Sequence, residues 1–151
     1  MSRDPAFKLI GEWRTPGSYR GALAMPVDAS GRLLMQCRDD IEGIIAPGKW
    51  GLFGGGIEAG EDARTAVARE FEEETGLDYA PERFRPAYQV LTGSPRWGLL
   101  SLFAVELTDP VSAIRTYEGA GFACCTRSQV EKLDVIAYLR PAIADFWDHA
   151  A

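Results

Sequence analysis

The chain has few of the residues that build disulfide scaffolds, zinc sites or histidine-based active sites. Its 151 residues include three cysteines and one histidine. Cys37, Cys124 and Cys125 are odd in number and contain no CxxC pair, which argues against a disulfide framework and against a zinc site. We interpret them as small thiols, buried or half-buried, in a reducing compartment. His149 lies near the C-terminus, where interaction with a helix dipole is a better interpretation than catalysis.

The sequence also lacks an excess of basic residues and a long apolar run. The net charge is −6, which argues against non-specific binding to nucleic acid or to an anionic membrane. No stretch approaches 18 apolar residues, so we expect no membrane span. The first 13 residues contain no continuous apolar core, so we expect no signal peptide. These absences predict a cytoplasmic protein, folded as one domain over residues 1–151.

What the sequence does contain is an alternation of short apolar segments with turn signals, around one strongly helical segment in the middle. We expect strands over 19–27, 32–38, 50–53, 83–92, 96–107 and 117–125. We expect helices over 62–75, from a capping box formed by Ser128 and Glu131, and over 139–149. Strands before and after a central helix predict an α/β fold, with a mixed sheet and helices on both of its faces.

The central helix carries an unusual cluster of glutamates in the stretch "REFEEETG", residues 69–76. On a helical wheel of about 100° per residue, Glu72 falls on the polar face, as a solvated charge run would. Glu70 and Glu74 fall on the arc shared with alanine and apolar residues. Arg69 can pair with Glu73 or Glu72. Glu70 and Glu74 have no such partner nearby in the sequence, and partly buried carboxylates are costly unless they are compensated.

A hard divalent cation would compensate these carboxylates. Mg²⁺ binds carboxylate oxygens, keeps several waters and shares ligands with substrate phosphates, and Mn²⁺ is a possible substitute. Three glycines, 54–56, precede the helix and would let the backbone approach an ion or a phosphate closely. The alternative interpretation of these glycines is a tight turn between strand and helix, and the two interpretations are compatible.

The stretch from Gly55 to Leu77 resembles the signature of the Nudix hydrolase family. That signature is Gly, five residues, Glu, seven residues, then Arg-Glu-U-x-Glu-Glu-x-Gly-U, where U is a bulky apolar residue. All nine constrained positions match over 23 residues; they are Gly55, Glu61, Arg69, Glu70, Phe71, Glu73, Glu74, Gly76 and Leu77. The resemblance implies an α/β/α sandwich with a mixed sheet over the whole chain.

The resemblance also implies an activity. Nudix enzymes hydrolyse a nucleoside diphosphate linked to another moiety, by attack of water at phosphorus. By analogy with the family, Glu70, Glu73 and Glu74 bind the metal, and the carbonyl of Gly54 completes the set. The same analogy has Arg69 orienting a glutamate, while Glu61 and Gly55 support the loop.

The residue that removes the proton from the attacking water is not fixed by the motif. Within the motif Glu70 is our first choice. Some family members instead use an acid from a later loop, and Glu118 in "TYEGAG" is our candidate for that position, although an exposed loop glutamate is at least as good an interpretation of it. Glu106, on a predicted strand, is a weaker choice.

The substrate is less well defined than the reaction. We expect a small nucleotide derivative, with a nucleoside triphosphate or a nucleotide sugar favoured, and no nucleic-acid partner. Trp50, Phe53 and Trp97 are candidates for stacking on a base, and Arg38 is a candidate for contacting phosphates, as is Arg96. Packing in the core or on the surface is the alternative for each aromatic residue.

Two other functions within the same fold remain open from the sequence. One is an inactive Nudix-fold module that binds a nucleotide as a sensor, which an eroded signature would favour. The other is an isomerase acting on an isoprenoid diphosphate, which would need further catalytic groups that the three cysteines do not supply. The resemblance further implies a possible homodimer.

Overall fold

The computed structural model describes residues 4–40, 42–44, 46–116 and 119–150. These residues form an eight-stranded mixed sheet. Its strands are β1 (Lys8–Ile10), β2 (Arg20–Val27), β3 (Leu33–Cys37), β4 (Trp50–Gly51), β5 (Phe53–Gly56), β6 (Arg85–Leu91), β7 (Leu99–Glu106) and β8 (Gly121–Cys125). The main path through the sheet runs β1-β6-β7-β2-β3-β4, with β5 paired to β2 and β8 paired to β3.

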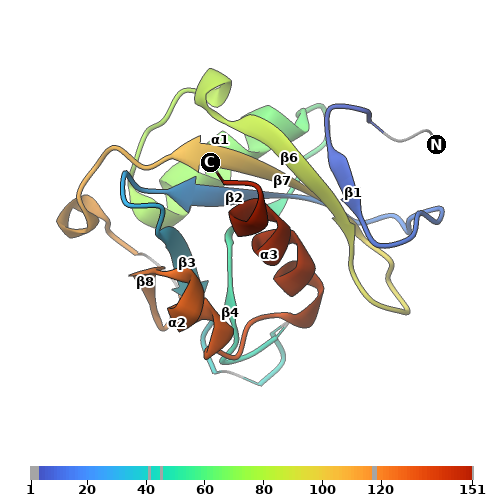
Figure 1. Cartoon of the computed structure of the whole chain (residues 1–151). Helices are drawn as coiled ribbons and strands as arrows, with labels where there is room; N and C mark the ends of the chain where they lie inside the picture. The colour runs from blue at the N-terminus through green and yellow to red at the C-terminus, as the bar shows by residue number, and fades with distance from the viewer. Residues whose placement is uncertain (1–3, 41, 45, 117–118, 151) are drawn as a thin grey trace.

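Strand β2 is the central element, and it changes partner along its length. It runs parallel to β7 over all eight of its residues. On its other side it pairs with β5 at Gly21–Ala24 and with β3 only at Val27. The sheet therefore divides beside β2 into a β5 branch and a branch containing β3, β4 and β8, which Figure 1 shows leaving the main sheet.

Helix α1 (Ala63–Thr75) forms where the sequence predicts it, because both of its ends are capped locally. The Asp62 carboxylate accepts a hydrogen bond from the Thr65 backbone N–H, which satisfies one of the free donors of the first turn. Gly76 ends the helix with φ 77°, a conformation that glycine adopts without steric cost. The predicted boundaries, from about residue 62 to 75, are thus confirmed.

Two further helices, α2 (Arg127–Glu131) and α3 (Arg140–Asp148), follow β8. The capping box begins two residues before the predicted position. Thr126 is the N-cap of α2, and it exchanges hydrogen bonds with Gln129, rather than Ser128 with Glu131. Short 3₁₀ turns occur at η1 (Pro81–Arg83), η2 (Val111–Ala113) and η3 (Ala137–Leu139). The predicted start at residue 139 is within one residue of the start of α3.

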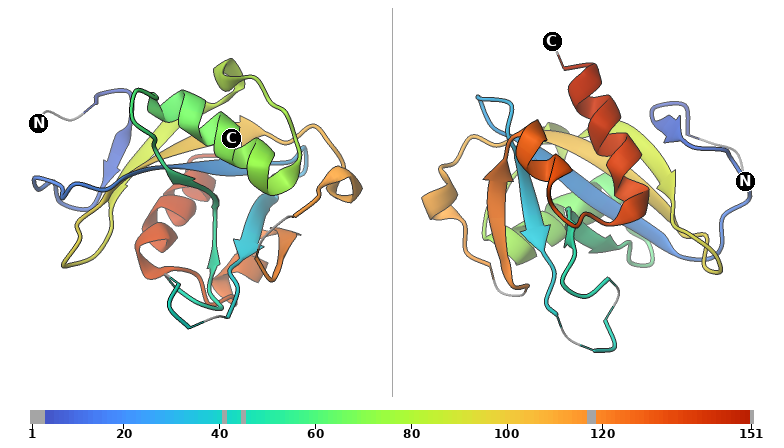
Figure 2. Two further views of the ribbon diagram at one scale, coloured as in Figure 1. Left: turned by 180° about the vertical axis from the view of Figure 1, so that it is seen from behind. Right: turned by 60° about the horizontal axis from the view of Figure 1, so that its bottom comes forward.

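The helices cover the two faces of the sheet, as Figures 1 and 2 show. On one face Val67 and Phe71 of α1 pack with Phe53, Phe84 and Phe103. On the other face η3 and α3 pack on β2, β3, β6 and β7 through a second apolar cluster that includes Leu139 and Ile143. The architecture is the mixed α/β sandwich predicted from the sequence. No helix in the described ranges is long and apolar enough to cross a membrane.

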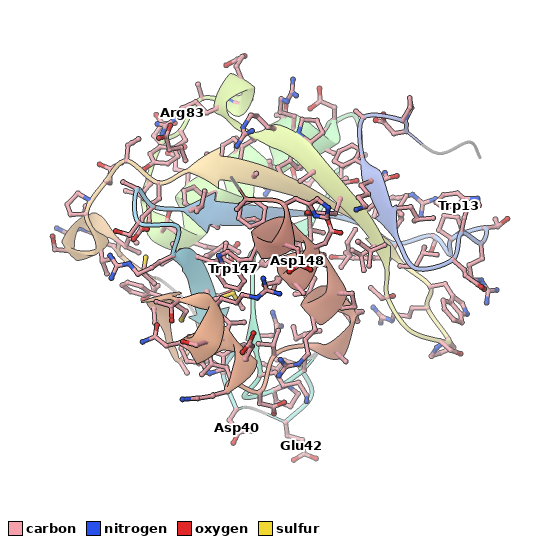
Figure 3. The ribbon with its side chains drawn as sticks, in the orientation of Figure 1. Trp13, Asp40, Glu42, Arg83, Trp147 and Asp148 are labelled. Carbon is pink, nitrogen blue, oxygen red and sulfur yellow. The ribbon has the colours of Figure 1, made fainter. Side chains whose placement is uncertain are left out.

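Side-chain contacts fix α3 in place at several points. Asp148, labelled in Figure 3, forms an ion pair of 2.7 Å with Arg127 of α2. Trp147 donates its indole N–H to the carbonyl of Gly31 in the β2–β3 turn, at 2.9 Å. Asp145 accepts from the Tyr88 hydroxyl at 2.8 Å. The C-terminal helix is therefore attached both to β6 and to the β2–β3 hairpin.

The strand predictions differ from the structure mainly at the ends of strands. The segment predicted as a strand over 83–92 begins at Arg85, because 81–83 form η1. Strand β1 was not predicted, since three residues are too few to show an alternating pattern. Residues 117–118, at the start of a predicted strand, lie outside the described residues, and β8 begins at Gly121.

Candidate active site

Helix α1 separates its glutamates as the wheel predicts. Glu74 is 4% exposed, and the side chain of Glu70 is 18% exposed. Glu72 is exposed. The Glu73 side chain is also largely exposed, at 57%, and lies 3.4 Å from the Arg69 guanidinium. Two of the three predicted metal ligands therefore face inward, while Glu73 lies at the rim.

Glu74 fastens α1 to the glycine strand β5. Its Oε1 atom accepts a hydrogen bond from the Gly54 backbone N–H, at 2.8 Å. Gly54 has φ 150°, and a Cβ at this position would lie 2.1 Å from the Ala22 carbonyl oxygen. No larger residue fits there without moving the backbone of β2. The glycine thus permits a close approach of backbone to carboxylate, whereas the sequence analysis predicts its close approach to an ion or a phosphate.

Gly55 makes the equivalent room for Glu70. A Cβ on Gly55 would lie 2.7 to 2.9 Å from the three atoms of the Glu70 carboxyl group. These distances are too short for unbonded atoms, so a side chain at position 55 would displace the carboxylate. Because glycine has no Cβ, Gly55 leaves room for the Glu70 carboxylate.

Arg69 holds the carboxylates around it in a network. Its Nε and one terminal nitrogen donate to the two oxygens of Glu61, at 2.8 and 2.9 Å. The other terminal nitrogen contacts Glu70 at 3.1 Å. The hydrogen bonds from Arg69 lower the pKa of Glu61 to about 2, and those from Glu61 raise the pKa of Arg69. The predicted supporting role of Glu61 is consistent with this geometry, because it fixes Arg69.

Beside these residues lies an open cavity of about 760 Å³. It is lined by the two inward-facing glutamates, Glu70 and Glu74, and by the glycines Gly54 and Gly55. Arg38, a predicted phosphate contact, lines it from the end of β3. The apolar part of the wall comes from the second core cluster; its residues are Leu23, Leu52, Leu100, Ile136 and Leu139. A cavity of this size can hold a nucleotide.

Three aromatic residues predicted as substrate contacts do not line this cavity. Phe53 is fully buried in the core, packed edge to face on Phe71, and the prediction that it meets the substrate is wrong because its ring has no exposed surface. Trp50 packs against the second core cluster. Trp97 stacks with Arg14, whose guanidinium carbon lies 4.1 Å from the ring centre.

Residues that the motif does not include also line the cavity. Tyr19 and Tyr138 do so, as does the β6–β7 loop from Thr92 to Arg96. Nothing in the sequence marks either tyrosine, because both reach the cavity through sheet register and helix packing. Glu118, the alternative base, lies outside the described residues.

Comparison with known proteins identifies the family. The family model described as "NUDIX domain" matches residues 18–144. The chain belongs to the Nudix family. The match includes the whole of α1 and all strands except β1.

The similar proteins have varied names. The structure is similar to that of the MutT protein from Methanosarcina mazei, with a TM-score of 0.72 and 21% identity, covering 91% of this chain and 97% of that one. It is also similar to the dihydroneopterin triphosphate pyrophosphohydrolase of E. coli, with a TM-score of 0.67 and 21% identity, covering 91% of this chain and 100% of that one. These likenesses show a common fold.

One curated relative is similar in sequence over a shorter stretch. An RNA pyrophosphohydrolase from Gluconacetobacter diazotrophicus is 44% identical over 64 residues, which are 40% of this chain and 38% of that protein. The stretch that the two share thus spans well under half of the relative's length.

Proposed function

We propose that this protein is a Nudix pyrophosphohydrolase that uses a divalent metal to hydrolyse a nucleoside diphosphate linked to another moiety. The observation that carries the proposal is the pair of inward-facing carboxylates, Glu70 and Glu74, beside Gly54 and Gly55 at the wall of a nucleotide-sized cavity. Membership of the family supports the same reaction class. In this reaction water attacks phosphorus and the pyrophosphate bond breaks.

The residues present fit a hard cation such as Mg²⁺ or Mn²⁺. The donors are carboxylate oxygens from Glu70 and Glu74 and, at the rim, from Glu73, together with the Gly54 carbonyl. Among the described residues no three acidic, histidine or cysteine side chains form a group that could hold a metal ion, and Arg69 contacts both Glu70 and Glu73 through one terminal nitrogen. Metal binding in this proposal therefore involves a change of side-chain conformation that brings Glu73 toward Glu70 and Glu74.

When bound, the metal would supply positive charge for the diphosphate and would lower the pKa of an attacking water. The chain's own residues would do the rest. Glu70, which Arg69 contacts at 3.1 Å, would accept a proton from that water. Arg69 keeps Glu61 ionised and holds both glutamates in position, since an arginine remains charged at all ordinary pH values. Glu118 stays a candidate for the same proton.

For the substrate we propose a nucleoside triphosphate or a nucleotide sugar, handled as a small molecule in the cytoplasm. The thiols of the chain are free, as a reducing compartment would leave them. Some similar proteins are named for larger or different substrates, such as Ap4A and RNA. Hydrolysis of an RNA 5′ end is the alternative that the substrate panel must include.

The test is a panel of nucleoside triphosphates, nucleotide sugars, ADP-ribose, dinucleoside polyphosphates and 5′-triphosphorylated RNA, each with Mg²⁺ or Mn²⁺. Glu74→Gln should lower kcat by at least about a hundredfold, since it removes a buried metal ligand. Glu72→Gln is the matched control and should keep wild-type activity, because Glu72 is exposed on the opposite side of α1. Ligand-induced thermal stabilisation with no turnover of any compound would instead favour the sensor function.

A further inference from the structure

The side chain of Tyr19 packs against three glycines. A Cβ on Gly21 would lie 3.1 Å from its Cε2 atom, and one on Gly98 would lie 2.9 Å from its Cδ2 atom. A Cβ on Gly56 would lie 3.7 Å from its hydroxyl oxygen. Two of these glycines are within strands, where glycine costs roughly 0.5–1 kcal/mol relative to alanine. These glycines leave room for the ring of Tyr19 against the sheet, and Gly21 leaves room for Leu100 as well; Tyr19 stays 40% exposed.

Tyr19 lies across the glycine strand from the glutamates. In β5 a Cβ on Gly55 would point toward Glu70, and a Cβ on Gly56 would point toward Tyr19. Successive residues of a strand face opposite sides of the sheet, so β5 separates the two groups by the thickness of its backbone. Both groups line the same cavity. A ligand in the cavity can therefore reach the glutamates with one part and Tyr19 with another.

Two arginines line the same cavity as Tyr19. Arg38 lines it from the end of β3, and Arg96 lines it from the β6–β7 loop. Burial raises the pKa of Tyr19 and Glu70 adds to the rise, while the positive charges of Arg96 and Arg38 oppose it. The cavity lining thus carries two cations, Arg38 and Arg96, in addition to the two acids Glu70 and Glu74, in a chain whose net charge is −6.

We propose that Tyr19, Arg96 and Arg38 form an anion subsite for a phosphate other than the diphosphate held at Glu70 and Glu74. Guanidinium groups and a phenol hydroxyl donate hydrogen bonds to phosphate oxygens, and arginine does so with two parallel bonds. The preferred substrate then carries at least three phosphates, as a nucleoside triphosphate does, and a nucleotide sugar is a poor substrate because it leaves this subsite without an anion. This inference rests on the proposed function for the position of the cleaved diphosphate.

The kinetic test compares a nucleoside triphosphate with a nucleotide sugar that has the same base, for example GTP with GDP-mannose. Arg96→Gln should lower kcat/KM for the triphosphate about tenfold or more, as loss of a charge-assisted contact does, and should change that for the sugar by less than about threefold. Tyr19→Phe keeps the ring on its glycines and should lower the triphosphate value by several-fold. An equal loss on both substrates, or a wild-type preference for the sugar, would overturn the proposal.

Arg85→Gln is the matched control. It removes one positive charge from the exposed start of β6, about 20 Å along the strand from its cavity end, and should leave both kcat/KM values unchanged. All three variants should keep the wild-type Tm to within about 2 °C, because none of the altered groups is in the core.

A binding measurement separates this proposal from the hydrolase proposal. If the wild-type protein turns over no compound, the proposed function fails, and calorimetry with inorganic triphosphate and inorganic diphosphate in Mg²⁺ still tests the subsite. The triphosphate should bind about tenfold more tightly to the wild-type protein, and Arg96→Gln should remove that difference. Equal affinity of the wild-type protein for both ions would refute the subsite.

Discussion

Gly55→Ala should separate activity from stability more sharply than any other single change in the site. The new Cβ would lie 2.7, 2.8 and 2.9 Å from three atoms of the Glu70 carboxyl group, and ordinary contact begins at 3.4 Å. The carboxylate must therefore move by roughly 0.6 Å, which is large on the scale of a preorganised site. Because a displacement of about 1 Å can cost a hundredfold in rate, we expect kcat/KM to fall about 10- to 100-fold.

The stability of the same variant should change little. Gly55 does not have a positive φ, so alanine meets no backbone strain there. Alanine restricts the unfolded chain, which stabilises the fold by about 0.4–1 kcal/mol, and repacking against the end of the Glu70 side chain costs about 1 kcal/mol. The free energy of unfolding should then stay within about 1 kcal/mol of wild type.

The assay for Gly55→Ala pairs urea denaturation with metal-dependent hydrolysis of the best substrate from the panel. Gly31→Ala is the contrasting control. Gly31 has φ 81° in open space at the β2–β3 turn, so alanine there should cost about 1 kcal/mol of stability and leave kcat/KM unchanged. Wild-type kcat/KM in Gly55→Ala would refute the reasoning, since it would mean that the Glu70 carboxylate need not occupy its observed position.

Three further predictions test the surroundings of the site. Arg69 lowers the pKa of Glu61 from the ordinary 4.5 to about 2. The ionised Glu61 therefore stabilises the fold above pH 4.5, and this contribution is lost as the pH falls toward 2. The difference in unfolding free energy between wild type and Glu61→Gln should shrink over that range. Phe53→Ala should cost about 3–5 kcal/mol in urea denaturation, as core truncations do, whereas a raised KM with unchanged stability would restore Phe53 as a substrate contact. Tyr88→Phe should cost about 1–2 kcal/mol by losing its bond to Asp145, with unchanged kcat in the hydrolysis assay.

The parts of the site that were predicted from the sequence are those set by local spacing. The ends of α1 depend on Asp62 and Gly76, and the inward direction of Glu70 and Glu74 depends on helical periodicity alone. Such features need no knowledge of the rest of the fold. The nine-position signature indicates the family, and the family implies the mixed sheet.

The parts that sequence analysis missed depend on contacts between distant segments. Tyr19 enters the site because Gly21 pairs with Gly56 and because Gly98 precedes β7 beside it. Phe53 was misassigned since a buried aromatic ring and a stacking ring look the same in a sequence, and only the packing of Phe71 on it distinguishes them. Trp97 likewise lies outside the cavity because of a contact between distant segments, the stacking of Arg14 on its ring.

The division of the sheet beside β2 has a consequence for how the protein would respond to a ligand. The cavity draws its walls from both branches, from the loop between β6 and β7, and from η3, so its residues run from Tyr19 to Leu139. No single hairpin or helix carries enough of it to bind on its own. A nucleotide would therefore bind only the fully assembled chain and stabilise it against global unfolding by RT ln(1 + [L]/Kd). Strand β1 contributes no cavity residue. Amides of β1 and β5 that exchange only through global unfolding should nevertheless both exchange more slowly when the ligand is bound.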